Sequence, residues 1–233
     1  MLCCDGMTTI VRFGKRLHQL RWMAQSDRHL VSPSRCGDER GAPSQSTWYE
    51  PSMAQGSTVF RIDVELSNVD AGVYETLELR TALHPSEDTT RLVARVLAQC
   101  LAYEDGITVG RGLSEADDPA LFVKDGAGNI AHWIDVGYPS AERLHRASKA
   151  ALKVTVLCHK APDGLVRIRE KRRIHNVDQI VVFLISPALV QSLADSLERG
   201  NQWNVVRTGE DLLVTVGDAL YSGACIETTL ANL

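Results

Sequence analysis

The chain has 233 residues, a mass of 25.6 kDa and a net charge of −4, with 44% hydrophobic and 23% charged residues. This composition is typical of a globular protein. A mean hydropathy of −0.11, without an apolar run near 18 residues, excludes a transmembrane role. The acidic balance argues against a protein that coats nucleic acid non-specifically, but it is compatible with a local basic groove.

Cysteine usage favours a reducing compartment. The six cysteines form no Cys-x-x-Cys pair and have no histidine at zinc-ligand spacing, so we expect no structural zinc site. Two of them, Cys100 and Cys158, lie in apolar stretches and are predicted to be small buried hydrophobic residues. The sequence shows no secretory signal, and we expect a cytoplasmic protein.

The composition changes near residue 56. Ser, Pro, Gly and charged residues dominate 32–52, a pattern typical of disorder or a linker. All four methionines lie at or before Met53. We therefore expect residues 1–55 to be a disordered or dispensable extension, with Met53 as the true start; a transit peptide is the alternative. Residues 56–233 are predicted to form a single domain.

The hydrophobic pattern after residue 56 predicts a mixture of strands and helices. Strands are expected at 59–67, 73–83, 121–124, 130–136, 152–158, 177–185, 205–207, 211–216 and 224–228. Helices are expected from a cap at Ser86 through Tyr103, at about 140–151 and at 187–199. The predicted fold class is α/β, with α+β character: one central mixed β-sheet flanked by helices.

Two aspartates flank the hairpin around residues 125–129. If Lys124 pairs with Asn129, Asp118 lies directly opposite Asp135, because each is equally far from the turn. Opposed carboxylates repel each other unless a cation neutralises them, and oxygen ligands suit Mg²⁺ or Mn²⁺. The alternative is that each aspartate only caps the loop or turn that follows it.

Three blocks of sequence resemble the YaeQ family in order and spacing, and the resemblance extends over about residues 58–233. The blocks are Leu83-His84-Pro85-Ser86-Glu87 with Arg91 and Arg95, Arg111-Gly112-Leu113-Ser114 leading to Asp117-Asp118-Pro119-Ala120-Leu121-Phe122, and Trp133-Ile134-Asp135-Val136-Gly137-Tyr138-Pro139 followed by Glu142-Arg143.

The resemblance implies a variant of the PD-(D/E)XK, restriction-endonuclease-like fold. In that superfamily one acid on the first helix and two acids on or near successive strands bind a divalent metal. Carried over to this chain, Glu87 is the helix acid and Asp135 the strand acid. Asp118 is the acid between them, with Asp117 as its neighbour and rival. The cofactor implied is Mg²⁺ or Mn²⁺.

The chain departs from this pattern at two positions. Most YaeQ-like sequences have glutamate in place of Asp135, and the superfamily's lysine is replaced by Gly137. Arg146 and Lys149, on the following helix, are candidates for the missing cation. Arginine stays protonated, so Arg146 could stabilise charge but could not act as a base, and Lys149 is the better candidate for a migrated lysine.

Basic residues near these acids are candidates for substrate binding. Arg91, Arg95 and Arg143 would contact phosphates, with pairing to a nearby acid as the alternative. His84 could orient Glu87 or bind substrate, or it could simply close a turn.

Two functions are compatible with these features. One is a metal-dependent phosphodiesterase or nuclease acting through Glu87, Asp118 and Asp135. The other is a catalytically inactive protein of the same fold that binds a protein or a nucleic acid as an accessory factor. The basic run at 167–173 could follow a nucleic-acid backbone, or it could be a solvated helix face. No membrane partner is expected, and the oligomeric state is not indicated.

Overall fold

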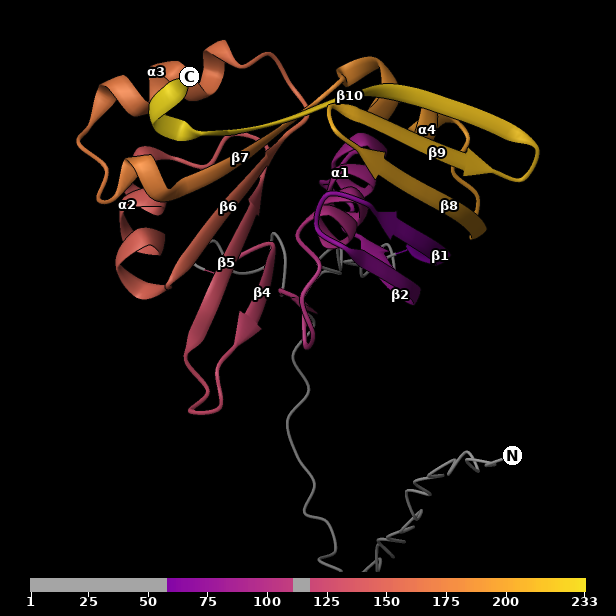
Figure 1. Cartoon of the computed structure of the whole chain (residues 1–233), viewed down its shortest axis with the longest axis horizontal. Coiled ribbons are helices and arrows are strands. Elements are labelled where there is room, and N and C mark those ends of the chain that lie inside the picture. Colours follow the sequence, from indigo (N-terminus) through magenta and orange to yellow (C-terminus); the bar gives the residue numbers. More distant parts are fainter. Residues whose placement is uncertain (1–57, 111–117) are drawn as a thin grey trace, which may run out of the picture. The chain divides into compact units, whose positions relative to one another are not determined.

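The computed structural model describes residues 58–110 and 118–233. Within these residues ten strands form one sheet, in the order β2-β1-β8-β9-β10-β7-β6-β5-β4-β3 (Figure 1). The predicted extension at 1–55 and the candidate acid Asp117 lie outside the described residues. No helix in the described part of the chain is both long and apolar enough to cross a membrane.

The strands are β1 (Thr58–Asn68), β2 (Val73–Leu83), β3 (Thr108–Val109), β4 (Leu121–Lys124), β5 (Ile130–Val136), β6 (Lys153–Cys158), β7 (Ile180–Ile185), β8 (Gly200–Thr208), β9 (Asp211–Val216) and β10 (Ala219–Thr229). The α-helices are α1 (Thr89–Leu101), α2 (Ala141–Ala150), α3 (Asp163–Lys171) and α4 (Pro187–Asp195). Short 3₁₀ turns occupy η2 (Val177–Gln179) and η3 (Leu230–Asn232).

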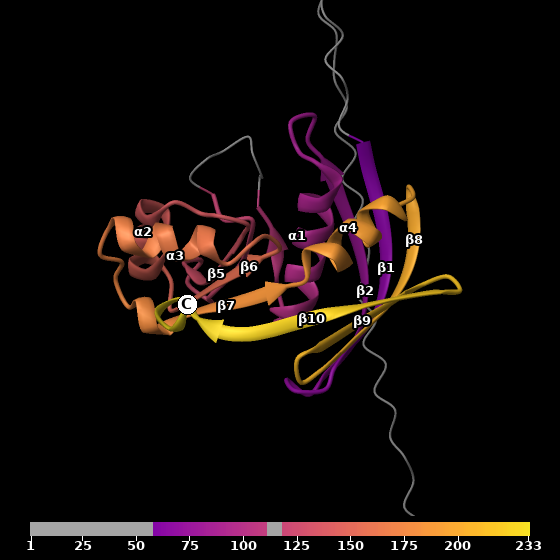
Figure 2. The ribbon, with the colours of Figure 1, turned by 90° about the horizontal axis from the view of Figure 1, so that it is seen from above.

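The long strand β10 joins two parts of the sheet. Its first half pairs with β9 and its second half with β7, both antiparallel, so it crosses from one part to the other (Figure 2). Strands β5, β6 and β7 are parallel, as are β1 and β8. The sheet is therefore mixed, as the sequence predicts.

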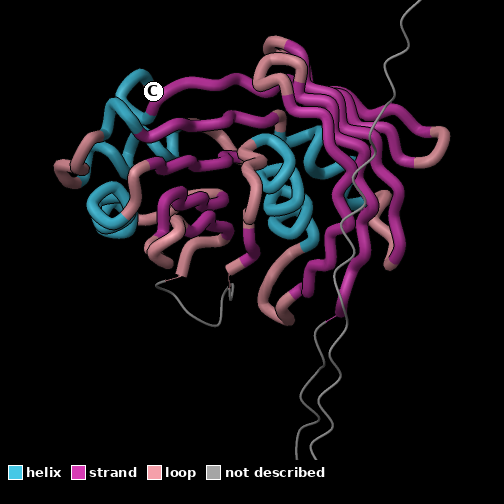
Figure 3. The backbone as a smooth tube through the Cα atoms, turned by 60° about the horizontal axis from the view of Figure 1, so that its bottom comes forward, coloured by secondary structure: helices cyan, strands magenta, loops and turns pink. Residues whose placement is uncertain are grey.

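Helices cover both faces of the parallel strands. The sheet bends around α1 and α4, while α2 and α3 lie on the other side of β5–β7 (Figure 3). The alternation along β5 shows the two layers: Ile134 belongs to the core around α1, and Trp133 belongs to the core that contains Leu144 of α2 and Leu165 of α3. Burial on both faces explains why β7 is continuously apolar and why β5 and β6 are mostly apolar.

Most predicted elements are confirmed, several of them with identical bounds. The hairpin of β1 and β2 forms with Phe60, Ile62, Val64 and Leu66 buried, as the alternation predicts. The capping residue of α1 differs from the prediction. Asp88, not Ser86, accepts a hydrogen bond from the backbone N–H of Arg91 at 2.7 Å. Strand β3 was not predicted, and the bounds of α3 were not predicted either.

Candidate functional site

Asp135 is a buried carboxylate near the carboxyl end of β5, with 3% of its surface exposed. Arg143, in the first turn of α2, donates to both of its oxygens, from Nε at 2.7 Å and from Nη2 at 2.8 Å. Trp133 Nε1 and the Ala120 N–H also donate to this carboxylate, at 3.0 and 3.4 Å. A bidentate guanidinium with two further donors fully satisfies this carboxylate.

The local sequence explains this geometry. Trp133 and Asp135 are two residues apart on one strand, so both side chains point to the same face, the one that α2 covers. Ser140 caps α2 by accepting from the Arg143 N–H at 3.2 Å, which places Arg143 in the first helical turn. Its guanidinium also lies 5.4 Å from the centre of the Trp133 ring, a cation–π distance.

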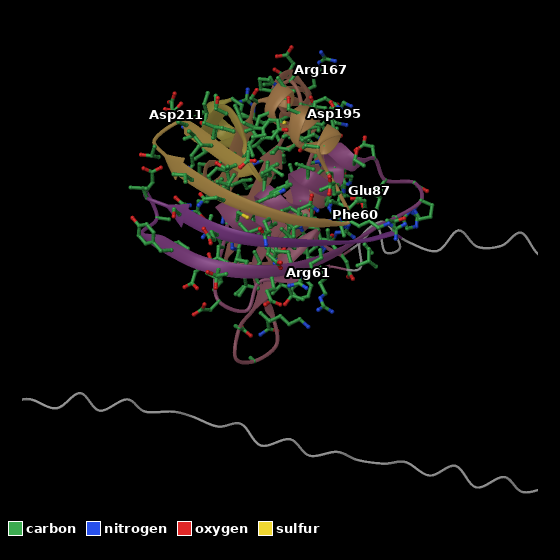
Figure 4. All side chains as sticks on the ribbon, turned by 90° about the vertical axis from the view of Figure 1, so that its right-hand side faces the viewer. Phe60, Arg61, Glu87, Arg167, Asp195 and Asp211 are labelled. Atoms are coloured by element: carbon green, nitrogen blue, oxygen red, sulfur yellow. The ribbon has the colours of Figure 1, made fainter. Side chains whose placement is uncertain are left out.

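Glu87 is held by two arginines of the helix that follows it. Its carboxylate lies 3.2 Å from Arg95 Nη2 and 3.6 Å from Arg91 Nε, and its side chain is almost completely buried (Figure 4). Arg95 also donates to Thr81 Oγ1 at 2.9 Å and to the Ala82 carbonyl at 3.0 Å. Burial lowers the pKa of the Arg95 guanidinium, and the Glu87 charge opposes that shift.

Arg91 reaches from α1 to the end of β5. Its Nη1 donates to the Val136 carbonyl at 3.0 Å. The two arginines therefore fix α1 against β2 on one side and β5 on the other. Both arginines pair with a nearby acid, Glu87, which is the alternative role that the sequence allowed for them.

The predicted register of the β4–β5 hairpin is wrong. Lys124 pairs with Ile130 rather than Asn129, and a β-bulge between Val123 and Lys124 shifts the remaining pairs, so that Leu121 pairs with Ile134. One extra residue in one strand changes which residues oppose each other. Asp135 consequently lies beside Ala120, not directly opposite Asp118.

Asp118 contributes its backbone to the site: the Arg143 guanidinium donates to the Asp118 carbonyl. The three acids expected to share a metal do not form a common ligand set. Among the described residues, no group of three or more His, Cys, Asp or Glu side chains is arranged to hold a metal ion. Two of the three, Glu87 and Asp135, already face arginine. The described acids, Glu87, Asp118 and Asp135, therefore do not fit a divalent cation.

The position at which the resemblance implies a lysine is occupied by a glycine, whose backbone conformation suits this residue. Gly137 follows β5 with φ of +85°, in the left-handed region that a lysine would adopt only with strain. A Cβ at this position would lie 3.5 Å from Arg91 Nη1 and 3.8 Å from His159 Cε1. The space beside the backbone is thus bordered by Arg91 and His159.

His159 is a residue that the sequence reading missed. It directly follows β6, is 5% exposed, and neither ring nitrogen has a hydrogen-bond partner among the described residues. Burial, reinforced by the charges of Lys160 and Arg91, lowers the pKa of His159 to about 4 despite the opposing charge of Asp88. One signal could have identified His159: it follows the carboxyl end of a predicted buried strand, and Asp135 lies near the carboxyl end of the neighbouring strand.

The remaining predicted residues lie elsewhere. His84 Nδ1 accepts from the Ser86 N–H at 3.1 Å, and its carbonyl accepts from the Glu87 N–H, so His84 closes the turn before α1. Arg146 and Lys149 are exposed on α2. Lys149 lies in the last turn, six residues from Arg143 and about 9 Å along the helix axis. The structure does not bring Lys149 to Asp135.

The fold and site together define a class: an α/β protein with a mixed sheet and two arginine-paired carboxylates near the junction of α1, β5 and α2. The family model described as "YaeQ protein" matches residues 53–222. The chain belongs to the YaeQ family.

Solved structures agree with this assignment. The crystal structure of the YaeQ protein from Pseudomonas syringae is 29% identical, with a TM-score of 0.67 over 75% of this chain and 97% of that one. That of Xanthomonas axonopodis pv. citri is 25% identical, with a TM-score of 0.63 over 74% and 98%. YaeQ of Salmonella typhi and of Escherichia coli K12 are 28% and 27% identical over 107 residues, 46% of this chain and 59% of each relative. The match thus spans less than two thirds of these two relatives.

Proposed function

We propose that this YaeQ-family protein acts by binding a partner, and that its acidic residues stabilise the fold instead of supporting metal-dependent hydrolysis of phosphodiesters. One observation carries the proposal: Arg143 donates to both oxygens of Asp135, at 2.7 and 2.8 Å. A metal would have to displace a buried, bidentate guanidinium and separate that cation from the Asp135 carboxylate. Breaking a buried pair in this way costs about 3–5 kcal/mol.

Two further features support a binding role. Glu87 is paired with Arg91 and Arg95, so a second acid of the expected metal site is neutralised inside the protein. At position 137 the backbone conformation favours glycine, and the lysine that the superfamily uses is absent. The competing function is the metal-dependent phosphodiesterase suggested by the resemblance, with Mg²⁺ or Mn²⁺ as cofactor.

Thermal unfolding of the full chain with and without Mn²⁺ separates the two functions. A ligand present at 100 times its Kd adds about 2.7 kcal/mol to stability, which raises Tm by a few degrees. We expect no such shift for the wild type. Asp135→Ala should instead lower Tm in the presence and absence of Mn²⁺, because Arg143 loses the carboxylate to which it donates two hydrogen bonds.

Asp178→Ala is the matched control, since Asp178 is an exposed acid outside the site. It should leave both melting curves unchanged. The proposal would be overturned by two results together. Mn²⁺ would raise the Tm of the wild type and of Asp178→Ala but not that of Asp135→Ala. The wild type and Asp178→Ala would also cleave plasmid DNA or RNA in the presence of Mn²⁺, and Asp135→Ala would not.

A further inference from the structure

Positive charge is concentrated in one part of an otherwise acidic chain. Residues 141–175 contain ten lysines and arginines against three aspartates and glutamates, a formal charge of +7 in a chain whose net charge is −4. These residues form α2, β6, α3 and the segment that leads to β7. An uneven distribution of this size creates a local positive potential even when the whole molecule is acidic.

The topology brings the basic ends of α2 and α3 together. Helix α2 connects β5 to β6, and α3 connects β6 to β7, on the same face of the sheet. Both helices therefore run from the carboxyl ends of the parallel strands back towards their amino ends (Figure 1). The rings of His145 in α2 and His175 after α3 lie 6.5 Å apart. We call the surface formed by His145, Lys149, Arg172, Arg173 and His175 the basic surface.

The charges of the basic surface act on one another. Burial, and then the positive charges of Lys149, Arg172 and His175, lower the pKa of His145. Lys149, Arg172 and Arg173 are exposed, and none of the three forms an ion pair with a carboxylate among residues 58–110 and 118–233. The acids on the same elements are Glu142, Asp163, Glu170 and Asp178. Among the described residues, no ion pair with a carboxylate relieves the repulsion between these cations.

A hollow of about 390 Å³ adjoins the basic surface. Arg169, Arg173 and His175 contribute to its lining, together with Asp178. Arg169 is held in place because its Nη1 donates to the carbonyls of Ala231 at 2.7 Å and Leu230 at 3.4 Å. On the same helix Arg167 projects outward at the edge of the molecule (Figure 4).

We propose that the basic surface binds the phosphate backbone of a nucleic acid. This proposal rests on the proposed function and names the class of its partner. Unpaired guanidinium and ammonium groups on one surface match phosphate oxygens in charge and in hydrogen-bonding geometry. Protein interfaces are depleted in lysine and have an apolar centre, whereas interfaces with nucleic acid are strongly positive. A nucleic acid therefore fits this surface better than an acidic protein does.

The test is fluorescence anisotropy of the full chain with labelled 20-nucleotide single-stranded DNA, duplex DNA and single-stranded RNA, at 50 and 200 mM salt. Three duplex phosphate contacts predict a loss of about 40-fold in affinity over this range. The triple variant Lys149→Gln, Arg172→Gln, Arg173→Gln should bind more weakly, with a salt slope that is smaller by about three.

The control triple variant is Lys124→Gln, Arg80→Gln, Arg199→Gln, which removes the same charge from exposed positions outside the basic surface. It should keep the wild-type affinity and salt slope. The charge-conserving triple variant Lys149→Arg, Arg172→Lys, Arg173→Lys should also keep the wild-type salt slope. Circular dichroism melts establish that each variant folds. The proposal is overturned if the wild type binds none of the three nucleic acids at 50 mM salt, or if both Gln triples lose affinity equally. Neither result bears on the response to Mn²⁺, which tests the proposed function separately.

Discussion

At the residue scale, the burial of Asp135 is stable only because Arg143 accompanies it. Their side chains are 4% and 17% exposed, so water reaches the carboxylate poorly and the guanidinium only in part. We predict that Arg143→Gln lowers the free energy of unfolding by about 3 kcal/mol, because it leaves a buried carboxylate without a cation. Urea denaturation monitored by circular dichroism measures this loss.

Glu142→Gln is the control for this prediction, since it changes one charge at the neighbouring exposed position. It should change stability by less than about 0.5 kcal/mol. In the double variant Asp135→Asn, Arg143→Gln neither charge of this pair remains, so the loss should be smaller than in Arg143→Gln alone. A double variant that loses the sum of the two single effects would show that the two side chains do not interact.

The backbone at position 137 gives a second prediction at this scale. Gly137 has φ of +85°, which costs a residue with a Cβ about 1–2 kcal/mol. Gly137→Ala should be destabilised by that amount without a clash, since its nearest neighbour would be 3.5 Å away. Gly126→Ala, in an exposed turn without positive φ and with open space around it, should be close to neutral. Equal stability of the two variants in urea would contradict this account.

The sequence names the candidate residues, but it does not decide between the alternative roles of their arginines. Glu87 pairs with Arg91 and Arg95 of α1, and Asp135 of β5 pairs with Arg143 of α2. Pairing with a nearby acid is one of two roles that the sequence allows for these arginines. The pairing of Arg143 with Asp135 could not be chosen over phosphate contact, because it depends on how α2 docks on the sheet. The same limit applies to His159, whose burial depends on elements distant in sequence.

At the element scale, the hairpin of β4 and β5 shows how a small local event changes a functional prediction. The strand bounds 121–124 and 130–136 follow from the hydrophobic pattern and are confirmed. The bulge at Val123/Lys124 leaves no trace in that pattern, because a bulge can absorb one extra residue without altering which side chains are apolar. The expected opposition of Asp118 and Asp135 depended on a regular ladder.

Two buried histidines at opposite ends of the parallel strands make stability depend on pH. His132 lies in β5 against Thr155 and Glu104, and His159 follows β6. Burial, with Lys153 adding to it for His132, lowers the pKa of each to about 4. Both are neutral in the folded protein at pH 5, whereas in the unfolded chain they are protonated below about pH 6.5. Their stabilising contribution is complete above pH 6.5 and is lost as the pH falls towards 4.

We therefore predict that the wild type loses stability between pH 7 and pH 5, by about 1 kcal/mol for each of these histidines after allowance for solvent screening. His159→Gln should show a smaller loss, because its side chain does not titrate. His175→Gln, at an exposed position, should follow the wild type. Urea titrations at the two pH values measure the difference, and an unchanged pH dependence in His159→Gln would refute the assignment.

At the scale of the whole molecule, one core joins the two parts of the sheet. Ile62 of β1 and Val205 of β8 belong to the same buried cluster as Ile134 of β5 and Leu157 of β6. Helix α1 contributes to this cluster, and β10 pairs with strands of both parts. Since neither part has this core to itself, we expect the sheet to unfold as one cooperative unit.

Three buried thiols report on this cooperativity. Cys100 in α1, Cys158 in β6 and Cys225 in β10 are free and fully buried. Burial raises the pKa of Cys100 to about 12 and that of Cys225 to about 11, so these thiols are unreactive until the structure opens. Pulsed alkylation in increasing urea, followed by peptide mass spectrometry, should show all three becoming reactive over the same range. If Cys158 reacts at lower urea than Cys100 and Cys225, the part built on β5–β7 opens independently, and the shared core does not couple it to the rest of the sheet.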